Sequence, residues 1–517
     1  MTRMRLTQVV RNLAAAFAAL SLLAAFGTSA VGQPASRTLT VAIPFEPPHL
    51  DPFESLDVQQ DLNYHLYRNL YRFTPDMAPH PDLAVADKVS EDGRTWTLEL
   101  RKNVVFHDGT PFNAAAVKYT IERMKDPKRA APMAVLFAPI TSVRIVDEHT
   151  VELQTKEPFA SLRNNLAHVN TGMISPAADQ ARGKEFGRKP VSAGAYELAE
   201  WVSGDRIVLK RFDRYAGPRP HYDTIVFRIV PDAQTRLVML ERGEADVAIR
   251  MPATQADIAE RNPQLQVLRL EGTRLLYMYF NLDKAPTTDI RVRRALNLAI
   301  DRQAIMKRVA LGAAAPAESV MERIVSYSTP VGKLEYKPDE ARELLRQAGA
   351  AGQTLRLVAP EGVWEFDRQT AEAVAGFLRN VGLKVELDII KDFGVYTKTL
   401  GSREHHLGMV GWAGSTGDPD HYLRRQLWGQ NAGKPWNFSG YKNPRVDELI
   451  GVGARTFDTR ERARIYADVQ RTVWNDYPWL ILHRVTGFAV ARTGIEGIEI
   501  YLNSQAHVFV NARAKAN

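Results

Sequence analysis

MVGWAGSTGDPDHYLRRQLW, residues 409–428, combines the signals of a strand, a loop and a helix. Its apolar start predicts the end of a buried strand. The glycine-rich segment that follows predicts a loop that another molecule can approach closely. Asp418 followed by Pro419 predicts the capped start of a helix. Loop amides, the Trp412 indole and a helix N-terminus at the end of a strand are typical of a ligand site in an open α/β sheet.

The composition indicates a large globular protein. The chain has 517 residues, enough for two or three domains, and is 45% hydrophobic and 24% charged. Its formal net charge is +8, but Lys and Arg are interleaved with acidic residues, so we expect no nucleic-acid partner. The sequence contains no cysteine, which excludes disulfides and a lipid-anchoring cysteine.

Residues 1–32 have the pattern of a secretory signal peptide. Three arginines precede an apolar run at 13–26, and small residues suited to cleavage follow at 28–32. A membrane anchor is the alternative, but the run is shorter than the roughly 20 residues that a spanning helix needs. We therefore expect a soluble, periplasmic protein.

Residues 81–123 predict a hairpin followed by a capped helix. Asp92-Gly93 is a strong turn signal between two alternating strands, and Asn113 precedes a helix with one apolar face. His107 and Asp108 could form a catalytic pair. In a short Asp-Gly-Thr turn, however, we expect them to hold the loop by hydrogen bonds.

The second half of the chain predicts alternating helices and strands. Strands at 355–359 and 383–389 flank a helix at 367–381, which is a βαβ unit and makes this half α/β. A further helix at 290–300 has an apolar stripe. We expect three arginines on its opposite face to be solvated: Arg291, Arg293 and Arg294.

Several blocks resemble one family. The string PDLAVADKVSEDGRTWTLELRKNVVFHDGTPFNAAAVKYTIER, residues 81–123, is similar to the signature of the extracytoplasmic solute-binding proteins of ABC importers, in family 5, the dipeptide/oligopeptide/nickel group. PVSAGAY at 190–196, GEADVAI at 243–249 and WNFSGYKNP at 436–444 resemble the same family in the same order. The first of these blocks lacks the central Thr and Pro of the family's PVGTGPY.

The resemblance implies an α/β protein with two lobes, the large three-subdomain variant of the type II periplasmic-binding-protein fold. Lobe I would comprise residues 33–275 and 485–517, with an inserted subdomain at about 76–188. Lobe II would comprise residues 276–484. The ligand cleft would lie between the lobes, and strands near 275–281 and 477–484 would cross from one lobe to the other.

The resemblance also implies a transport function. The lobes would close on a small peptide or peptide-like ligand by a hinge motion. The closed protein, a monomer, would then dock on an ABC permease and its ATPase at the inner membrane, and it would perform no chemistry itself. A non-peptide solute such as an opine, a metal chelate or haem is the alternative ligand in the same transport role.

Seven residues are the candidate ligand-binding groups of the cleft: Trp412, Gly414, Ser415, Asp418, Asp57, Trp436 and Asn437. We expect no cofactor and no metal site, since the sequence contains no phosphate-binding, dinucleotide-binding or zinc motif. If the ligand is a nickel chelate, His421 and His483 are the candidate contacts. In the absence of such a ligand, structural roles are favoured for both.

One position bears on the ligand's chemistry. Peptide binders of this family anchor the free α-amine of the ligand with an aspartate just after the Gly-Trp of this loop. Here Ser415 holds the place where we align that aspartate, and it supplies no charge. Asp418 could substitute, but a cap aspartate already accepts from helix amides. We therefore expect free-amine dipeptides to be poor ligands, and a blocked, γ-linked, opine-like or non-peptide solute to be favoured.

Two other classes of function are weighed against this one. A serine hydrolase using Ser415 would fit the segment Ala413–Gly417, which is one residue away from a Gly-x-Ser-x-Gly nucleophile elbow. The helix start at Asp418 comes several residues too late for an elbow, and an oxyanion loop is not visible. A structural or adhesion protein would have no reason for the glycine-rich loop.

Overall fold

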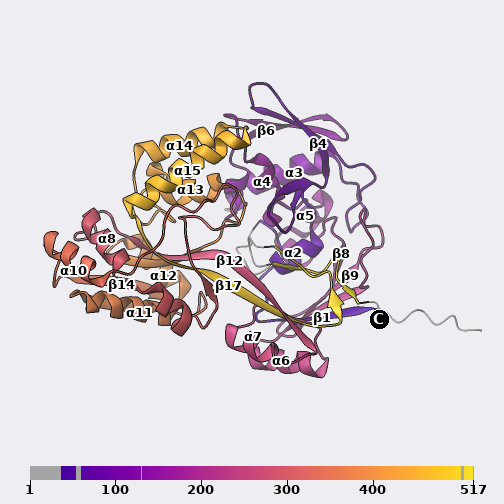
Figure 1. The fold of residues 1–517 in the computed structure, drawn as a ribbon. Helices are drawn as coiled ribbons and strands as arrows, with labels where there is room; N and C mark the ends of the chain where they lie inside the picture. Colours follow the sequence, from indigo (N-terminus) through magenta and orange to yellow (C-terminus); the bar gives the residue numbers. More distant parts are fainter. Residues whose placement is uncertain (1–36, 54–59, 130, 502–505, 516–517) are drawn as a thin grey trace, which may run out of the picture. The chain divides into compact units, whose positions relative to one another are not determined.

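A continuous eleven-stranded mixed sheet joins the two halves of the chain (Figure 1). It is seen in a computed structural model that describes residues 37–515 except 54–59, 130 and 502–505. The predicted signal peptide therefore lies outside the described residues. The strands follow the order β15 (Lys384–Ile390), β14 (Thr354–Pro360), β16 (Leu407–Trp412), β12 (Leu265–Phe280), β17 (Trp479–Arg492), β11 (Val247–Ala248), β1 (Thr38–Ile43), β10 (Thr224–Ile229), β9 (Arg206–Arg211) and β8 (Tyr196–Val202), with β13 (Ala314–Ala315) also on β17.

The strands β12 and β17, of 16 and 14 residues, connect the two ends of this sheet. They pair antiparallel. The first part of β12, at 265–270, pairs with the end of β17, which also pairs with β11. The second part of β12, at 275–280, lies between β17 and β16. A register shift between Leu270 and Arg274 separates the two parts. β12 and β17 thus include most of the segments near 275–281 and 477–484, where the sequence predicts strands.

The second half contains the predicted βαβ unit. β14 and β15 are parallel along their whole length, from Thr354 opposite Lys384 to Pro360 opposite Ile390. The helix α11 (Asp367–Asn380) connects them. Together with α8 (Ile290–Leu298) and α10 (Pro338–Gln347), α11 contributes to a buried core that includes Leu296, Leu345, Val374 and Leu378.

The prediction for the arginines of α8 is wrong at one position. Arg291 and Arg294 are exposed, but Arg293 is buried. Its guanidinium donates to four backbone carbonyls, two at the end of α15 (Thr459–Asp476) and two in the loop before α8. The carbonyls at a helix C-terminus lack partners within the helix, so an arginine from a neighbouring element can satisfy them.

The segment of residues 84–155 forms a separate four-stranded antiparallel sheet. Its order is β4 (Ala84–Val89), β5 (Thr95–Leu100), β7 (Thr150–Thr155) and β6 (Ile140–Asp147). The predicted β4–β5 hairpin is confirmed, with Gly93 in the left-handed region at φ +69°. The predicted helix is α3 (Ala114–Lys125), and its cap Asn113 accepts from the Ala116 amide. Asp108 accepts from Thr110 and Ser175, which confirms its structural role in the turn.

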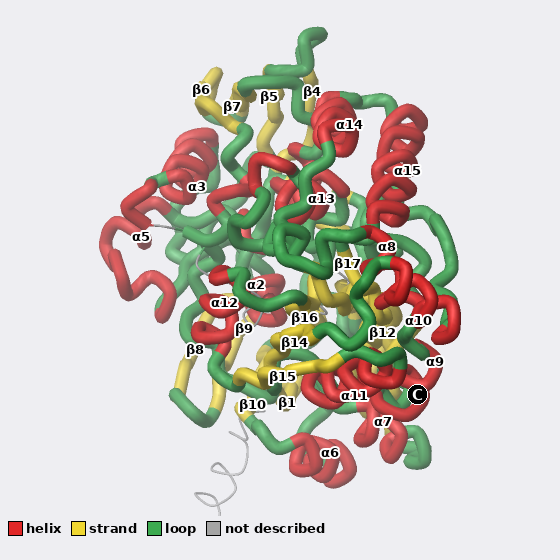
Figure 2. Tube along the Cα trace, turned by 90° about the vertical axis from the view of Figure 1, so that its left-hand side faces the viewer, coloured by secondary structure: helices red, strands yellow, loops and turns green. Residues whose placement is uncertain are grey.

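The remaining elements complete both halves (Figure 2). Helix α14 lies beside the separate sheet in both views (Figures 1 and 2). Within the described residues, no helix combines the length and the apolar character that crossing a bilayer requires. The elements not yet given are α2 (Gln60–Leu66), α4 (Leu162–Ala167), α5 (Pro176–Arg182), α6 (Ala233–Arg242), α7 (Ala253–Ala259), α9 (Arg302–Ala304), α12 (Phe393–Ser402), α13 (Pro419–Leu427), α14 (Pro444–Arg455), and the strand pairs β2 (Tyr71–Phe73) with β3 (Pro79–Pro81), β18 (Ile495–Glu496) with β21 (Arg513–Ala514), and β19 (Glu499–Tyr501) with β20 (Ala506–Val508).

Two glycines give a matched test of this packing. A Cβ at Gly194 would lie 2.3 Å from the Leu66 backbone at the end of α2, whereas a Cβ at Gly376 in α11 would meet nothing within 4 Å. We expect Gly194→Ala to lower the free energy of unfolding by about 1–3 kcal/mol or more, because backbone must move. Gly376→Ala should raise it by roughly 0.4–1 kcal/mol. Urea unfolding of both variants checks this, and a Gly194→Ala protein as stable as wild type would contradict it.

Candidate functional site

The loop after β16 has the predicted strand–loop–helix form. β16 ends at Trp412, and α13 begins at Pro419 with Asp418 as its N-cap. The Asp418 carboxylate accepts from the Asp420 amide at 2.9 Å. The loop therefore brings the end of a central strand and the start of a helix together, as the sequence predicts.

An aromatic and cationic group surrounds Trp412, and we call it the indole cluster. It consists of Trp412, His421, Arg425 and Trp436. The ring centroids of Trp412 and Trp436 are 4.7 Å apart and the rings are steeply inclined, at 66°. His421 lies 6.4 Å from Trp412, and the Arg425 guanidinium lies 5.6 Å from one indole centroid and 5.3 Å from the other. Two of the seven predicted residues, Trp412 and Trp436, thus meet in one place.

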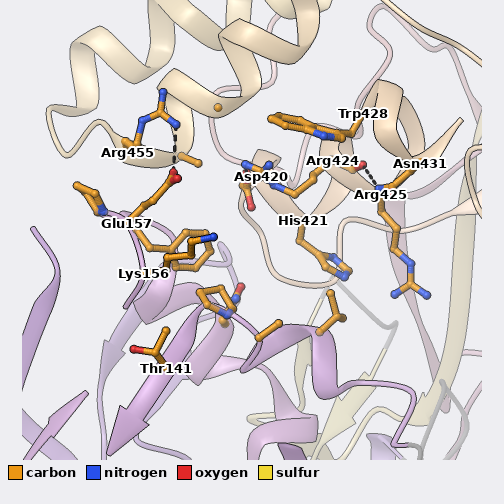
Figure 3. A pocket seen from close by; sticks show the side chains of 18 of the residues that line it. Thr141, Lys156, Glu157, Asp420, His421, Arg424, Arg425, Trp428, Asn431 and Arg455 are labelled. Atoms are coloured by element: carbon orange, nitrogen blue, oxygen red, sulfur yellow. Dashed lines mark hydrogen bonds and ion pairs between the residues drawn. The ribbon is translucent and has the colours of Figure 1, made fainter. Parts of the chain in front are cut away.

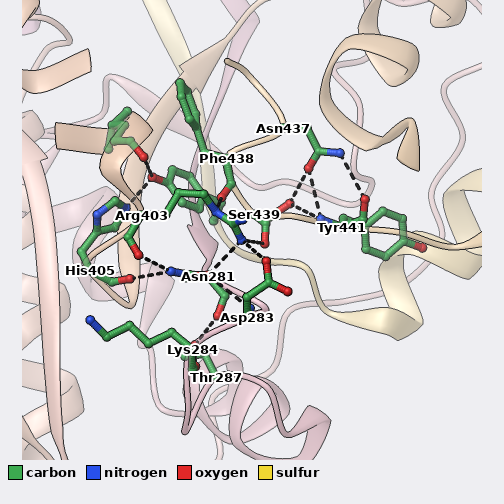
Figure 4. A network of polar contacts seen from close by, with 12 residues as sticks. Asn281, Asp283, Lys284, Thr287, Arg403, His405, Asn437, Phe438, Ser439 and Tyr441 are labelled. Atoms are coloured by element: carbon green, nitrogen blue, oxygen red, sulfur yellow. Dashed lines mark hydrogen bonds and ion pairs between the residues drawn. The ribbon is translucent and has the colours of Figure 1, made fainter. Parts of the chain in front are cut away.

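Trp436 is held in an unusual backbone conformation. Its φ is +80°, in the left-handed region that residues with a side chain seldom occupy. The next residue, Asn437, is fully buried, and its side-chain amide donates to the carbonyls of Trp428 and Tyr441 (Figure 4). Its oxygen accepts from Ser439 and the Tyr441 amide. Asn437 therefore fixes the turn that presents Trp436, and its hydrogen-bonding groups are occupied.

Two cavities meet the indole cluster. The first, the β16 cavity, has a volume of about 740 Å³. It is lined by the end of β16, by residues that follow β1 and β11, by residues between 362 and 366 and between 393 and 400, by Trp436, and by β17 at 485–488. The second, the α13 cavity, has a volume of about 690 Å³. Residues 132–165 line one side of it and residues 420–455, including His421 and Arg425, line the other (Figure 3). Because Trp412 contacts both Trp436 and His421, the cluster lies between the two cavities.

The remaining predicted residues have other neighbours. Asp418 is buried, accepts from the Ser161 hydroxyl at 2.7 Å and pairs with Arg462 at 3.0 Å. Gly414 packs closely, since a Cβ there would lie 2.1 Å from a methyl carbon of Val325. Ser415 is partly buried in the loop, where its amide donates to the Ala413 carbonyl. Asp57 lies outside the described residues.

His421 bears on the hydrolase alternative. Both of its ring nitrogens are buried, and neither has a hydrogen-bond partner in the described structure. Burial lowers the pKa of this imidazole to about 3. A serine nucleophile needs a base within hydrogen-bond reach, and His421 does not stand in that relation to Ser415. The arrangement gives the hydrolase reading no support.

His483, the other candidate for contact with a metal chelate, lies within β17. It is almost fully buried, and burial lowers its pKa to about 4. Across the described ranges, no three His, Asp or Glu side chains gather so as to hold a metal ion.

Glu322 is a notable group that sequence reasoning missed. It is fully buried, one carboxylate oxygen accepts from the Leu275 amide at 3.2 Å, and the other has no partner among the described residues. A Cβ at Gly414 would lie 3.5 Å from that second oxygen, so the carboxyl lies against the loop. Burial raises its pKa to about 8. Glu322 belongs to no motif, and only the fold brings it here.

The raised pKa of Glu322 predicts a pH dependence of stability. In the unfolded chain this carboxyl ionises near its ordinary pKa of 4.5, and in the folded protein near 8. Between these values the folded state binds more protons, so the free energy of unfolding should fall as pH rises, by at most about 1.4 kcal/mol per unit. Glu322→Gln should remove this fall, while Glu404→Gln, at a largely exposed side chain, should keep it.

Urea unfolding of the three proteins between pH 4.5 and 9 measures the effect. The informative quantity is the difference between wild type and Glu322→Gln, because other groups titrate in both. Parallel stability curves for these two proteins would show that Glu322 is ionised at neutral pH in the folded state.

The mixed sheet, the pair of crossing strands and an aromatic loop between two cavities define the class of a two-lobed binding protein. Comparison with known proteins agrees. Residues 78–434 match the family model described as bacterial extracellular solute-binding proteins, family 5, middle region. The chain therefore belongs to the bacterial extracellular solute-binding proteins of family 5, as its sequence blocks predict.

Individual relatives cover nearly the whole chain. The glutathione-binding protein GsiB of Escherichia coli K12 is 34% identical over 465 residues, which are 87% of this chain and 89% of that protein. HbpA2 from Haemophilus parasuis has a TM-score of 0.84 at 24% identity, over 93% of this chain and 100% of its own. A dipeptide-binding protein from Pseudoalteromonas sp. SM9913, solved with Met-Leu, has a TM-score of 0.80 at 24% identity, over 93% and 99%. These structures confirm the two-lobed fold.

Proposed function

We propose that this protein captures a peptide or peptide-like solute in the periplasm and delivers it to an ABC permease and its ATPase. It acts as a monomer and performs no chemistry itself. The observation that carries the proposal is the indole cluster between two cavities, in a chain of the solute-binding family. GsiB is named for glutathione, a peptide, and the Pseudoalteromonas protein holds a dipeptide, which supports a ligand of this class.

The lobe boundaries at 275, 276, 484 and 485, and the inserted subdomain at 76–188, are part of the proposal. With these boundaries, several contacts run from the subdomain to lobe II. The Asn164 amide donates to the Thr416 carbonyl at 3.0 Å, and the Ser161 hydroxyl donates to Asp418. The Ala160 amide donates to the Ala454 carbonyl at 2.8 Å. These bonds would break if the lobes separated, so in this proposal the described arrangement is the closed one.

The ligand's amine is the first point of selection. A buried ammonium needs a charged partner, and without one it loses several kcal/mol of hydration. Ser415 supplies no charge. Asp418 is already engaged by Ser161, by Arg462 and by the helix amide of Asp420. We therefore infer that the cleft favours solutes that place no free α-amine beside Ser415. Such solutes are N-blocked peptides and γ-linked peptides, in which the α-amine is displaced from the amide chain.

Closure on the ligand should be measurable. We expect the radius of gyration from small-angle scattering to fall when ligand is added to ligand-free protein, because the hinge brings the lobes together. Mass spectrometry of whatever co-purifies with protein that has not been refolded identifies the ligand, and thereby also tests the opine, metal-chelate and haem alternatives. An unchanged radius at saturating ligand would argue for a rigid site.

Selection against a free amine should appear in calorimetry with matched free and N-acetylated peptides. We expect the acetylated member of each pair to bind more tightly, because a neutral hydrogen bond nets only about 1 kcal/mol, against about 1.5–3 for a charged one. Asp418→Asn should weaken the binding of the free and the acetylated peptide to the same extent, because the substitution removes the ion pair with Arg462. A strong preference for the free amine that Asp418→Asn abolishes would show that Asp418 is the amine anchor.

A further inference from the structure

Arg425 is an arginine that has no counter-charge among the described residues. It is partly buried, and among the described residues no carboxylate lies within ion-pairing distance of its guanidinium and no hydrogen bond satisfies it. Its neighbour Arg424 differs, since Arg424 binds Asp420 at 3.0 and 2.7 Å. Figure 3 shows the two side chains extending in different directions, with Arg425 away from Asp420. Burial lowers the pKa of Arg425, as removal of a cation from water requires.

The two indoles hold this guanidinium in place. Its carbon lies within 6 Å of the centroids of both Trp412 and Trp436, which is the range of a cation–π contact. Such contacts offset part of the desolvation and restrict the side chain. They leave the N–H groups at the edge of the guanidinium plane unused, and that planar fork matches a carboxylate in bidentate geometry.

The surroundings favour an anion. The α13 cavity is lined by four cationic side chains, Lys156, Arg424, Arg425 and Arg455, and by two acidic ones, Glu157 and Asp420. The formal net charge of these lining side chains is therefore +2. Both acidic groups already have arginine partners, Arg455 at 3.3 Å and Arg424 at 2.7 Å. The acids of this cavity therefore do not neutralise Arg425.

His421 supplies a second, independent sign of a missing partner. Both ring nitrogens are buried in the same cluster and neither has a hydrogen-bond partner in the described part of the chain. A neutral imidazole always carries one N–H donor. Two adjacent side chains with unused donors, one of them charged, form a receptor for an acceptor group of a ligand.

We propose that Arg425 binds a carboxylate of the transported solute, with His421 as a neutral donor beside it, so that the protein selects acidic peptide-like solutes. This inference rests on the proposed function and deepens it. Together with the lack of a free charged partner for an amine at Ser415, it describes a site that recognises the acid end of its ligand.

The probes are glutathione and N-acetylated di- and tripeptides, each prepared as the free acid and as the C-terminal carboxamide. Calorimetry compares wild type with Arg425→Gln, Arg425→Lys and Arg464→Gln, the last at a side chain that is 80% exposed on α15. We expect wild type and Arg464→Gln to bind the preferred acid at least tenfold more tightly than its amide. Arg425→Gln should lose this preference, because it should bind the acid more weakly than wild type does and the amide equally well. Arg425→Lys should retain part of the preference.

Stability without ligand gives a second readout. Because Arg425→Gln removes a cation that has no counter-charge, we expect its melting temperature to be no lower than that of wild type. A sharply lowered melting temperature would assign Arg425 a structural role and overturn the inference. An acid preference that persists in Arg425→Gln would also overturn it, while the proposed function stands. Failure of every acid and amide to bind wild type would instead refute the peptide-like ligand itself, and the inference with it.

Discussion

The antiparallel pairing of β12 with β17 is the interaction on which the rest of the structure depends. These two strands are the backbone by which the halves of the sheet share one hydrogen-bonded ladder, and twelve residue pairs join them. A register shift between Leu270 and Arg274 interrupts the ladder midway. A β-bulge increases local twist and bends a strand, so the ladder bends where the two parts of β12 meet.

The loop after β16 owes its position to that pairing. β16 lies beside β12, with Trp412 opposite Leu275, so the loop leaves the sheet beside the second part of β12. Asp418 then has three partners, the helix amide, Ser161 and Arg462. A single buried carboxylate thus caps α13 and connects it to Ser161, which precedes α4.

Much of the local structure could be predicted from the sequence, because its signals act over a few residues. Gly93 forms its turn, Asn113 caps α3, and Asp418-Pro419 begins α13, each by hydrogen bonds or backbone geometry within three residues. The βαβ unit follows from periodicity in the same way. Arg293 shows the limit of this reasoning: the helical spacing predicts an exposed side chain, but the end of α15, far along the chain, buries it.

By itself, the sequence determined the family, the α/β class, the crossing strands and the loop that carries Trp412, since these are set by local propensity and by blocks that persist along the chain. Only the tertiary structure decided which side chains gather around that loop. In the folded chain, Trp436 and Arg425 lie against Trp412. Glu322 is buried beside Gly414, and Asn437 stabilises a turn by hydrogen bonds. The reason is physical: whether a charge is paired depends on which distant elements surround it, and neighbouring residues such as Arg424 and Arg425 can have opposite surroundings.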